Sequence, residues 1–202
     1  MPVWTISSQT GTGDAAIAVE LAARARVPLF DREMLATLAS SLEPSLASSD
    51  LDDLEERVGG RLNALALSAA ITSGSPAAFQ ELQLRQTLPS LGRAVLRQAA
   101  RGSAVVVANA AFAALAEHPG ALHVRLRAPF RWRVEEVRRR DLVDAERAKR
   151  VVRHDDQLQR HWVRALYDAD VDDPAGFGLV IDASRLSRER IVEMLLAAGG
   201  CT

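Results

Sequence analysis

The feature that most constrains this chain is its opening stretch, residues 3–35, which reads VWTISSQTGTGDAAIAVELAARARVPLFDREML. Residues 3–7 form a β-branched and aromatic run typical of a buried parallel strand. Gly11 and Gly13 then supply the backbone freedom that a sharp turn needs. From Asp14 onward, apolar residues at helical spacing predict an amphipathic helix that continues until Pro28. A strand, a glycine turn and a helix in this order predict the start of a nucleotide-binding α/β domain.

The turn itself indicates what it would bind. A helix that starts directly after the turn points its unpaired N–H groups, and the positive end of its dipole, at whatever lies above. In phosphate-binding loops that ligand is a phosphate group.

The side chains of the turn depart from the usual phosphate-binding motif. That motif reads GxxxxGK[ST], and here its four fixed places hold Ser8, Gly13, Asp14 and Ala15. Lys149, the chain's single lysine, lies too far along the sequence to replace the missing one locally. Two interpretations of Asp14 stay open. It is an N-cap, which contributes about 1 kcal/mol, or it repels a phosphate at about 4 Å by up to ~4 kcal/mol and so weakens triphosphate binding.

Length and composition limit the remaining possibilities. The 202 residues are enough for one full α/β domain, with 48% apolar and 25% charged residues, as in ordinary globular proteins. The net charge of −1 gives no general attraction to nucleic acid or to a membrane. Cys201, the single cysteine, cannot form an internal disulfide. No leader peptide or membrane span is recognisable, so we expect a cytoplasmic protein.

The second half of the chain alternates strands with helices. Apolar runs predict strands at residues 103–108, 122–126 and 178–181, and helices at 110–117 and 186–198. Together with the opening, this alternation predicts a mainly parallel sheet of five strands with helices on both faces.

Between the opening and these strands lies a leucine-rich region. We expect a helix over residues 31–41, a Ser-rich loop over 42–53, and mostly helical structure over 54–101 with a break at 73–76. The leucines at helical spacing favour core packing over a dedicated groove for a partner.

Residues 130–161 predict a strongly charged helical region, with arginines at positions 131, 133, 138, 139, 140, 147, 150 and 153 among others. One interpretation is a solvated surface helix with i,i+4 pairs such as Glu135 with Arg139 and Glu136 with Arg140. The other is a mobile lid whose arginines neutralise charge during phosphoryl transfer. No aromatic stacking platform accompanies these arginines, which disfavours a nucleic-acid binder.

Four motifs, in order and covering nearly the whole chain, resemble the cytidylate kinase-like family of P-loop nucleoside monophosphate kinases. The opening ISSQTGTGDAAIAVELAARARVPLFDRE resembles the family's ITISR[EQ]xGSGGxxIAxxLAxxLGxPxxDRE. VVVANAAFAAL is similar to VIVGRGAxxIL, and HVRLRAPFRWRVEEV to HVRLxAPxxxRIxRV. DADVDDPAGFGLVIDASRLS is similar to GVDWDDPxxYDLVINTSRLS.

The resemblance implies a P-loop NTPase fold, a three-layer α/β sandwich with a helical NMP-binding insert and a lid. It divides one domain, 1–202, into the P-loop and second strand (1–33), the insert (34–101), core strands (102–129), the lid region (130–164), and the last strand with the C-terminal helix (165–202). It also implies transfer of the γ-phosphoryl group of ATP to CMP or dCMP with Mg²⁺. Homodimer formation stays open.

The resemblance places candidate site residues on this sequence. For catalysis these are Arg133, Arg140 and Asp156. Those for nucleotide or phosphate binding are Gly11, Thr12, Gly13, Asp14, Asp31, Arg32 and Arg160. Asp170 and Asp173 match further family positions beyond the lid. No metal-ligating residue is singled out.

Several departures from the family pattern remove positive charge. Ser8, Asn109 and Gln159 stand where the family has arginine, and Asp14 replaces a loop glycine. A one-residue shift would let Arg160 replace the arginine missing at Gln159. Two hypotheses follow: an unusual working kinase whose lid arginines, such as Arg133, Arg138 or Arg140, neutralise the phosphates, or a catalytically degenerate kinase fold kept for nucleotide or anion binding or for regulation.

Overall fold

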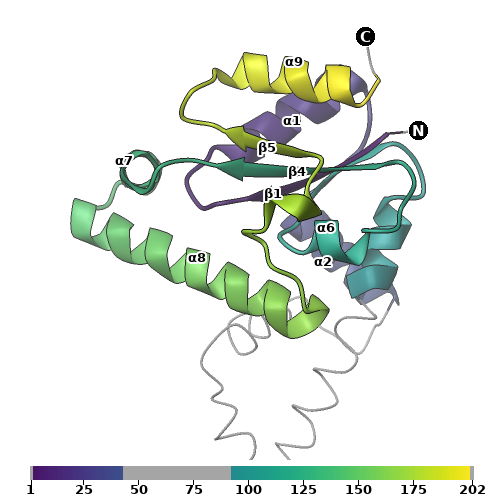
Figure 1. Ribbon diagram of the computed structural model, residues 1–202, viewed down its shortest axis with the longest axis horizontal. Helices are drawn as coiled ribbons and strands as arrows, with labels where there is room; N and C mark the ends of the chain where they lie inside the picture. Colours follow the sequence, from purple (N-terminus) through teal and green to yellow (C-terminus); the bar gives the residue numbers. More distant parts are fainter. Residues whose placement is uncertain (1, 43–91, 201–202) are drawn as a thin grey trace, which may run out of the picture.

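The computed structural model describes residues 2–42 and 92–200, and its centre is a five-stranded parallel sheet (Figure 1). The strand order across the sheet is β2-β3-β1-β4-β5. The strands are β1 Val3–Ser8, β2 Leu29–Phe30, β3 Ala104–Val107, β4 Ala121–Arg127 and β5 Leu179–Asp182. The parallel sheet predicted from alternating strands and helices is confirmed, and the opening strand lies at its centre.

Helices cover both faces of this sheet (Figure 1). On one face lie α1 (Asp14–Ala25) and α9 (Arg188–Ala198), and on the other α2 (Arg32–Leu42) and α6 (Ala111–Ala114). The side-chain alternation of β1 explains this arrangement. Trp4 and Ile6 pack against α1 and α9, while Val3 packs against α6 and the helical residues 92–99. The three-layer α/β class predicted from the sequence is therefore confirmed.

The central strand is anchored by its tryptophan. Trp4 is fully buried, and its indole Nε1 donates a hydrogen bond of 2.8 Å to the carbonyl oxygen of Leu195 in α9. A buried indole N–H requires such a partner. This bond fixes the C-terminal helix over β1, the strand that leads into the glycine turn.

The arginine-rich region forms two helices, so the single helical region expected over 130–161 is corrected. Helix α7 (Phe130–Asp141) ends at Leu142, which has a φ of 54°, and α8 (Ala145–Tyr167) begins after its N-cap Asp144. The Asp144 carboxylate accepts a hydrogen bond of 2.7 Å from the backbone N–H of Arg147. A left-handed residue followed by a strong N-cap interrupts the helical pattern.

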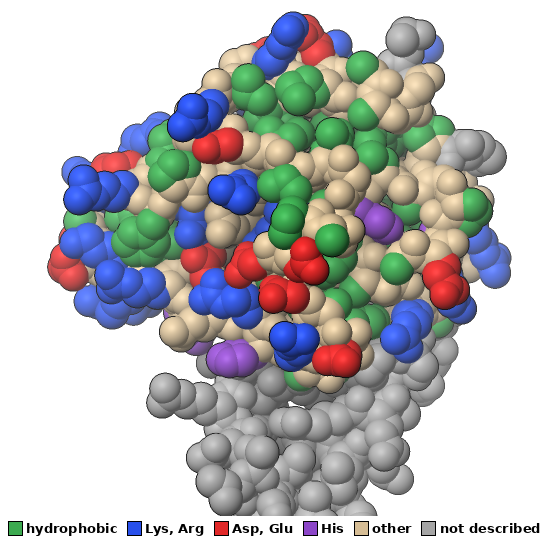
Figure 2. Space-filling view, in the orientation of Figure 1, with side chains coloured by type: hydrophobic (Ala, Val, Ile, Leu, Met, Phe, Trp, Pro, Cys, Tyr) green, Lys and Arg blue, Asp and Glu red, His purple; other side chains and the backbone are tan. Residues whose placement is uncertain are grey.

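The ion pairs expected on α7 also differ. Glu135 pairs with Arg138 at 2.9 Å and Glu136 pairs with Arg139, both at i,i+3 spacing. Arg140 pairs instead with its neighbour Asp141. Figure 2 shows Lys and Arg side chains gathered over α7 and the adjoining end of α8.

Residues 92–99 are helical, with Val95 and Leu96 buried, as the core-packing interpretation of the leucine-rich region predicts. The predicted loop from residue 43 to 53, the helical structure over 54–91 and the bulk of the expected insert lie outside the described residues. No helix in the part of the chain that the structure describes is both long and apolar enough to cross a lipid bilayer.

Candidate functional site

The turn after β1 is held by its own backbone and by its neighbours. Gln9 donates its backbone N–H to the carbonyl oxygen of Leu126 at 3.0 Å, and the buried Thr12 hydroxyl donates to the carbonyl oxygen of Gln9 at 2.8 Å. Gly11 and Gly13 have φ values of 90° and 77°, which L side chains rarely adopt. Both glycines are thus required at the positions where the sequence predicts a sharp turn.

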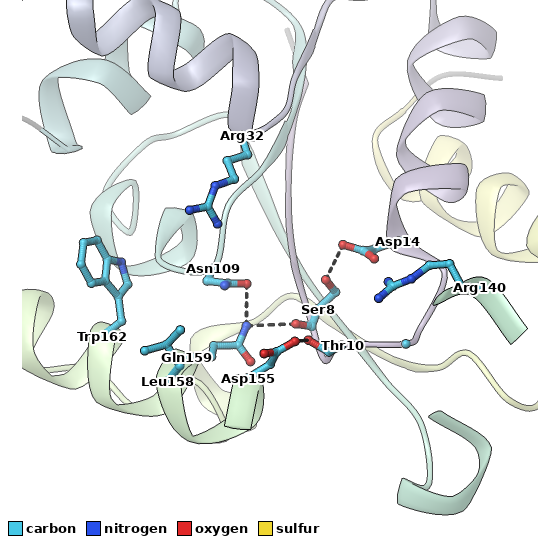
Figure 3. Close-up of a pocket in the computed structure, with 11 residues that line it drawn as sticks. Ser8, Thr10, Asp14, Arg32, Asn109, Arg140, Asp155, Leu158, Gln159 and Trp162 are labelled. Atoms are coloured by element: carbon cyan, nitrogen blue, oxygen red, sulfur yellow. Dashed lines mark hydrogen bonds between the residues drawn. The ribbon is translucent and has the colours of Figure 1, made fainter. Parts of the chain in front are cut away.

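Asp14 is not the N-cap of α1, so that interpretation is wrong. Gly13 is the N-cap, in the left-handed conformation and with no side-chain capping bond, and Asp14 is already the first helical residue. The Asp14 carboxylate instead accepts a hydrogen bond of 2.6 Å from the Ser8 hydroxyl (Figure 3). A Cβ atom placed on Gly13 would meet no heavy atom within 4 Å.

A cleft of about 510 Å³ lies beside the turn (Figure 3). It is lined by residues from the ends of β1 and β3 and from helices α1, α2, α7 and α8: Ser8, Thr10, Gly11, Asp14, Arg32, Asn109, Arg140, Asp155, Leu158, Gln159 and Trp162. Arg32 and Arg140 supply two positive charges, and Asp14 and Asp155 two negative ones. The described residues that line the cleft therefore carry equal numbers of positive and negative charges.

The three positions where the family pattern has arginine meet at this cleft. The Gln159 side-chain nitrogen Nε2 donates to the carbonyl oxygen of Ser8 at 3.0 Å and to Asn109 Oδ1 at 2.6 Å. Ser8, Asn109 and Gln159 come from β1, the segment after β3, and α8. Three scattered departures in the sequence are thus one structural change, a neutral hydrogen-bonded cluster in place of three cations.

Behind this cluster lies a buried arginine. Arg125, on β4 and only 4% exposed, donates to Gln159 Oε1 and to Asp172 Oδ1, each at 3.1 Å. Burial lowers the pKa of Arg125 from its ordinary value, and the charge of Asp172 opposes that shift. Arg125 is a structural cation that fixes the Gln159 side chain from the side of β4.

Arg160, the predicted replacement for the missing arginine, points elsewhere. It lies at 3.4 Å from Asp172, is about half exposed, and does not line the cleft.

Arg133 and Asp156, both predicted to be catalytic, face each other beneath the loop. Arg133 makes two hydrogen bonds to the Asp156 carboxylate, at 2.9 and 2.8 Å, and donates to the carbonyl oxygens of Ala128 and Thr10 at 3.1 and 3.2 Å. Neither residue lines the cleft. The structure therefore places this pair where it holds α7, α8 and the loop together.

Arg140, the third predicted catalytic residue, does line the cleft. Its guanidinium group donates to both carboxylate oxygens of Asp141, at 2.6 and 3.0 Å. This hydrogen bonding raises the pKa of Arg140, and the charges of Asp14 and Asp155 add to the effect. Asp155 is itself held by the Thr10 hydroxyl at 2.9 Å. In Figure 3 the Arg140 side chain lies beside Asp14.

The remaining predicted site residues divide between the cleft and the turns. Arg32 points into the cleft from the start of α2 (Figure 3). Asp31 accepts a hydrogen bond of 3.0 Å from the backbone N–H of Met34 at the start of α2. Asp170 and Asp173 accept backbone N–H bonds within the turn after α8, from Asp172 and Ala175.

Sequence reasoning missed Trp162, Leu158 and Asp155 as cleft residues. They come from α8 at a spacing of three and four residues, which places them on one face of that helix. Gln159 lies on the same face, so helical spacing counted from Gln159 would have indicated these three residues.

Comparison with known proteins identifies the family. The model of the cytidylate kinase-like family matches residues 3–185. The chain belongs to the cytidylate kinase-like family. The resemblance inferred from the four sequence motifs is thereby confirmed.

A cytidylate kinase from Methanopyrus kandleri is 31% identical to this chain over 77 residues, an alignment that covers 38% of this chain and 40% of that enzyme. The chain thus spans less than half of this curated relative.

Solved structures confirm the fold. The superposition on an uncharacterised protein from Eubacterium ventriosum covers 100% of this chain and 99% of that protein, with a TM-score of 0.69 and 15% identity. The superposition on shikimate kinase from Bacteroides thetaiotaomicron covers 98% of this chain and 97% of that enzyme, with a TM-score of 0.50 and 13% identity. At these identities the likeness shows a shared P-loop kinase fold.

Proposed function

We propose that this chain binds a nucleotide in the cleft beside the turn, and that its capacity for phosphoryl transfer is strongly reduced. The observation that carries this proposal is the cluster of Ser8, Asn109 and Gln159, which brings neutral groups to three positions where the family pattern has arginine. Asp14 adds a negative charge directly beside them.

The shape of the site supports nucleotide binding. The N-terminal end of α1 has no side-chain cap and borders the cleft at Asp14, and the free N–H groups of such a helix end attract anions. Arg32 and Arg140 provide positive charge on the cleft walls, and Trp162 provides an aromatic surface. These groups fit the phosphate and the base of a nucleotide.

The charge of the site argues against efficient transfer. Phosphoryl transfer depends on electrostatic stabilisation of the transferred group, and each lost contact of this kind costs about 3 kcal/mol, or a factor of about 10² to 10³ in rate. Asp14 stands where the usual motif has its phosphate-binding lysine, and Ala15 where it has the Mg²⁺-binding hydroxyl. These residues do not fit Mg²⁺·ATP in the usual pose.

A second candidate is a working kinase that transfers phosphate from ATP to CMP or dCMP with Mg²⁺. The observation that favours it is the pair of arginines in the cleft, Arg32 from α2 and Arg140 from α7. Arginine forms strong charge-assisted hydrogen bonds with phosphate oxygens, so these two residues would supply positive charge that phosphoryl transfer needs.

Titration calorimetry and a coupled ADP-release assay together separate the two candidates. We expect CMP, dCMP or ATP to bind the wild-type chain, and we expect turnover to stay near the background of a reaction without protein. Arg32→Ala should weaken binding, whereas Arg138→Ala, on the exposed face of α7, should leave it unchanged. Turnover at ordinary kinase rates would establish the second candidate, and absence of binding with all three nucleotides would refute both.

A further inference from the structure

Asn109 lines the cleft, and one side of its carboxamide group is already engaged. The residue is exposed, lines the cleft after the end of β3, and accepts a hydrogen bond of 2.6 Å at Oδ1 from Gln159 (Figure 3). Which side of Asn109 faces a ligand depends on the residues behind it.

Arg125 fixes the orientation of the Gln159 carboxamide group. A guanidinium group carries five N–H donors and no acceptor, so whatever faces it must accept. Arg125 is buried and donates to Gln159 at 3.1 Å, which requires that the Gln159 oxygen, and not its nitrogen, point toward β4.

Gln159 in turn fixes the orientation of the Asn109 carboxamide group. With Oε1 facing Arg125, its Nε2 faces the carbonyl oxygen of Ser8 and the side chain of Asn109. A backbone carbonyl can only accept, so the Ser8 contact fixes the same orientation independently. Asn109 must therefore turn its oxygen toward Gln159.

The amide nitrogen of Asn109 is therefore the polar atom left to face the cleft. Within the described part of the chain no residue accepts a hydrogen bond from it. The same cleft is lined by the half-buried indole of Trp162 and the side chain of Leu158. A flat apolar surface and one oriented polar group in a single cleft suit a planar heterocycle that stacks and is recognised at its edge.

We propose that Asn109 is a specificity-determining residue that offers a hydrogen-bond donor to an acceptor on the edge of a nucleobase, and that Gln159 is the positioning residue that fixes this donor through Arg125. This inference rests on the proposed nucleotide-binding function.

CMP and UMP form a matched pair of probes. Their bases have the same shape, but cytosine has an acceptor ring nitrogen beside a donor amino group, whereas uracil has a donor N–H beside an acceptor oxygen. The carbonyl oxygen at position 2 is common to both bases, so a donor that faces the ring nitrogen and position 4 favours one of the two nucleotides. We expect their dissociation constants for the wild-type chain, measured by calorimetry, to differ by about tenfold, since leaving a polar group unpaired costs on that order.

Two isosteric substitutions should reverse this preference. Gln159→Glu keeps an acceptor for Arg125 but cannot donate to Asn109, so the Asn109 amide turns over and presents its oxygen to the cleft. Asn109→Asp, at an exposed position where folding is little affected, presents an oxygen directly. In both variants we expect the nucleotide that bound more weakly to become the better ligand, with the ratio inverted by about tenfold or more.

Gln157→Glu is the matched control, because it makes the same chemical change at an exposed position of α8 and should keep the wild-type ratio. Equal affinity of wild type for CMP and UMP, or a ratio unchanged in both variants, would overturn the assignment of Asn109 and leave the proposed nucleotide site standing. Failure of the wild-type chain to bind either nucleotide would instead refute the proposed function, and this inference with it.

Discussion

Arg133 and Asp156 are joined by two parallel hydrogen bonds, from Nη1 to Oδ1 at 2.9 Å and from Nη2 to Oδ2 at 2.8 Å. The two side chains are only 4% and 13% exposed. The same guanidinium group also donates to the carbonyl oxygen of Thr10 in the turn after β1. One arginine therefore fastens α7 to α8 and both helices to the candidate phosphate-binding loop.

Arg133→Ala should reduce stability more than it alters the cleft directly. Removing one partner of a buried pair leaves an uncompensated charge, so we expect a loss of about 3 to 5 kcal/mol in the free energy of unfolding. Urea denaturation measures this loss. Arg138→Ala is the control on the same helix, because its pair with Glu135 is exposed and should contribute less than about 1 kcal/mol. Equal stability changes in the two variants would contradict the structural role of Arg133.

The two glycines of the turn should respond differently to an added methyl group. Gly11→Ala would place a Cβ atom 2.7 Å from the carbonyl oxygen of Arg133, whereas the Cβ of Gly13→Ala would meet nothing within 4 Å. Both substitutions strain a positive φ, at a cost of about 1 to 2 kcal/mol. We expect Gly11→Ala to cost about 1 to 3 kcal/mol more, because α7 must shift. Similar melting temperatures for the two variants would show that α7 does not press on the loop.

Asp14→Asn should raise nucleotide affinity. The substitution removes the negative charge and keeps an acceptor for the Ser8 hydroxyl. Repulsion of up to ~4 kcal/mol at about 4 Å is reduced by solvent in an open cleft, so we expect the dissociation constant for CMP or ATP to fall by about tenfold. Calorimetry provides the measurement.

The control for Asp14→Asn is Glu20→Gln, which makes the same change in net charge farther along α1, where Glu20 pairs with Arg24 and Arg188. We expect its affinity for nucleotide to match the wild type. A dissociation constant for Asp14→Asn that stays unchanged or increases would rule out Asp14 as the group that opposes phosphate.

His123 should make stability depend on pH. Burial lowers the pKa of this imidazole below its usual value of 6.5, and its Nδ1 lies 2.7 Å from the Thr5 hydroxyl on the neighbouring strand. As pH falls below 6.5 the unfolded chain takes up the proton first, so the folded state loses stability until the folded pKa is also passed.

Urea denaturation at about pH 7.5 and about pH 5.5 measures this loss, which for one proton cannot exceed about 1.4 kcal/mol per pH unit. His123→Gln should reduce the difference in unfolding free energy between the two pH values. His161→Gln, at an exposed position of α8, should leave that difference as in the wild type. If His123→Gln keeps the full difference, another group is responsible.

Local pattern was sufficient to predict much of the fold. The β-branched runs and the helical spacing of Ile17 and Leu21 predict β1 and α1 because the burial of an apolar face depends on periodicity, which is written in the sequence. The break at Leu142 was missed, since a left-handed residue other than glycine leaves no strong local signal and Asp144 was not recognised as an N-cap. The partners of the α7 glutamates were also missed, because i,i+3 and i,i+4 pairs are nearly equal in energy.

The order of strands and helices, the need for glycine at the turn and the family all follow from the sequence alone. Folding is what joins Ser8, Asn109 and Gln159 in one cluster, and what buries Arg133 against Asp156 while Arg32 and Arg140 face the cleft. The parallel sheet explains these long-range contacts. It brings the carboxyl ends of β1 and β3 to one edge, where α8 crosses them, so contacts at that edge join residues as many as 151 positions apart.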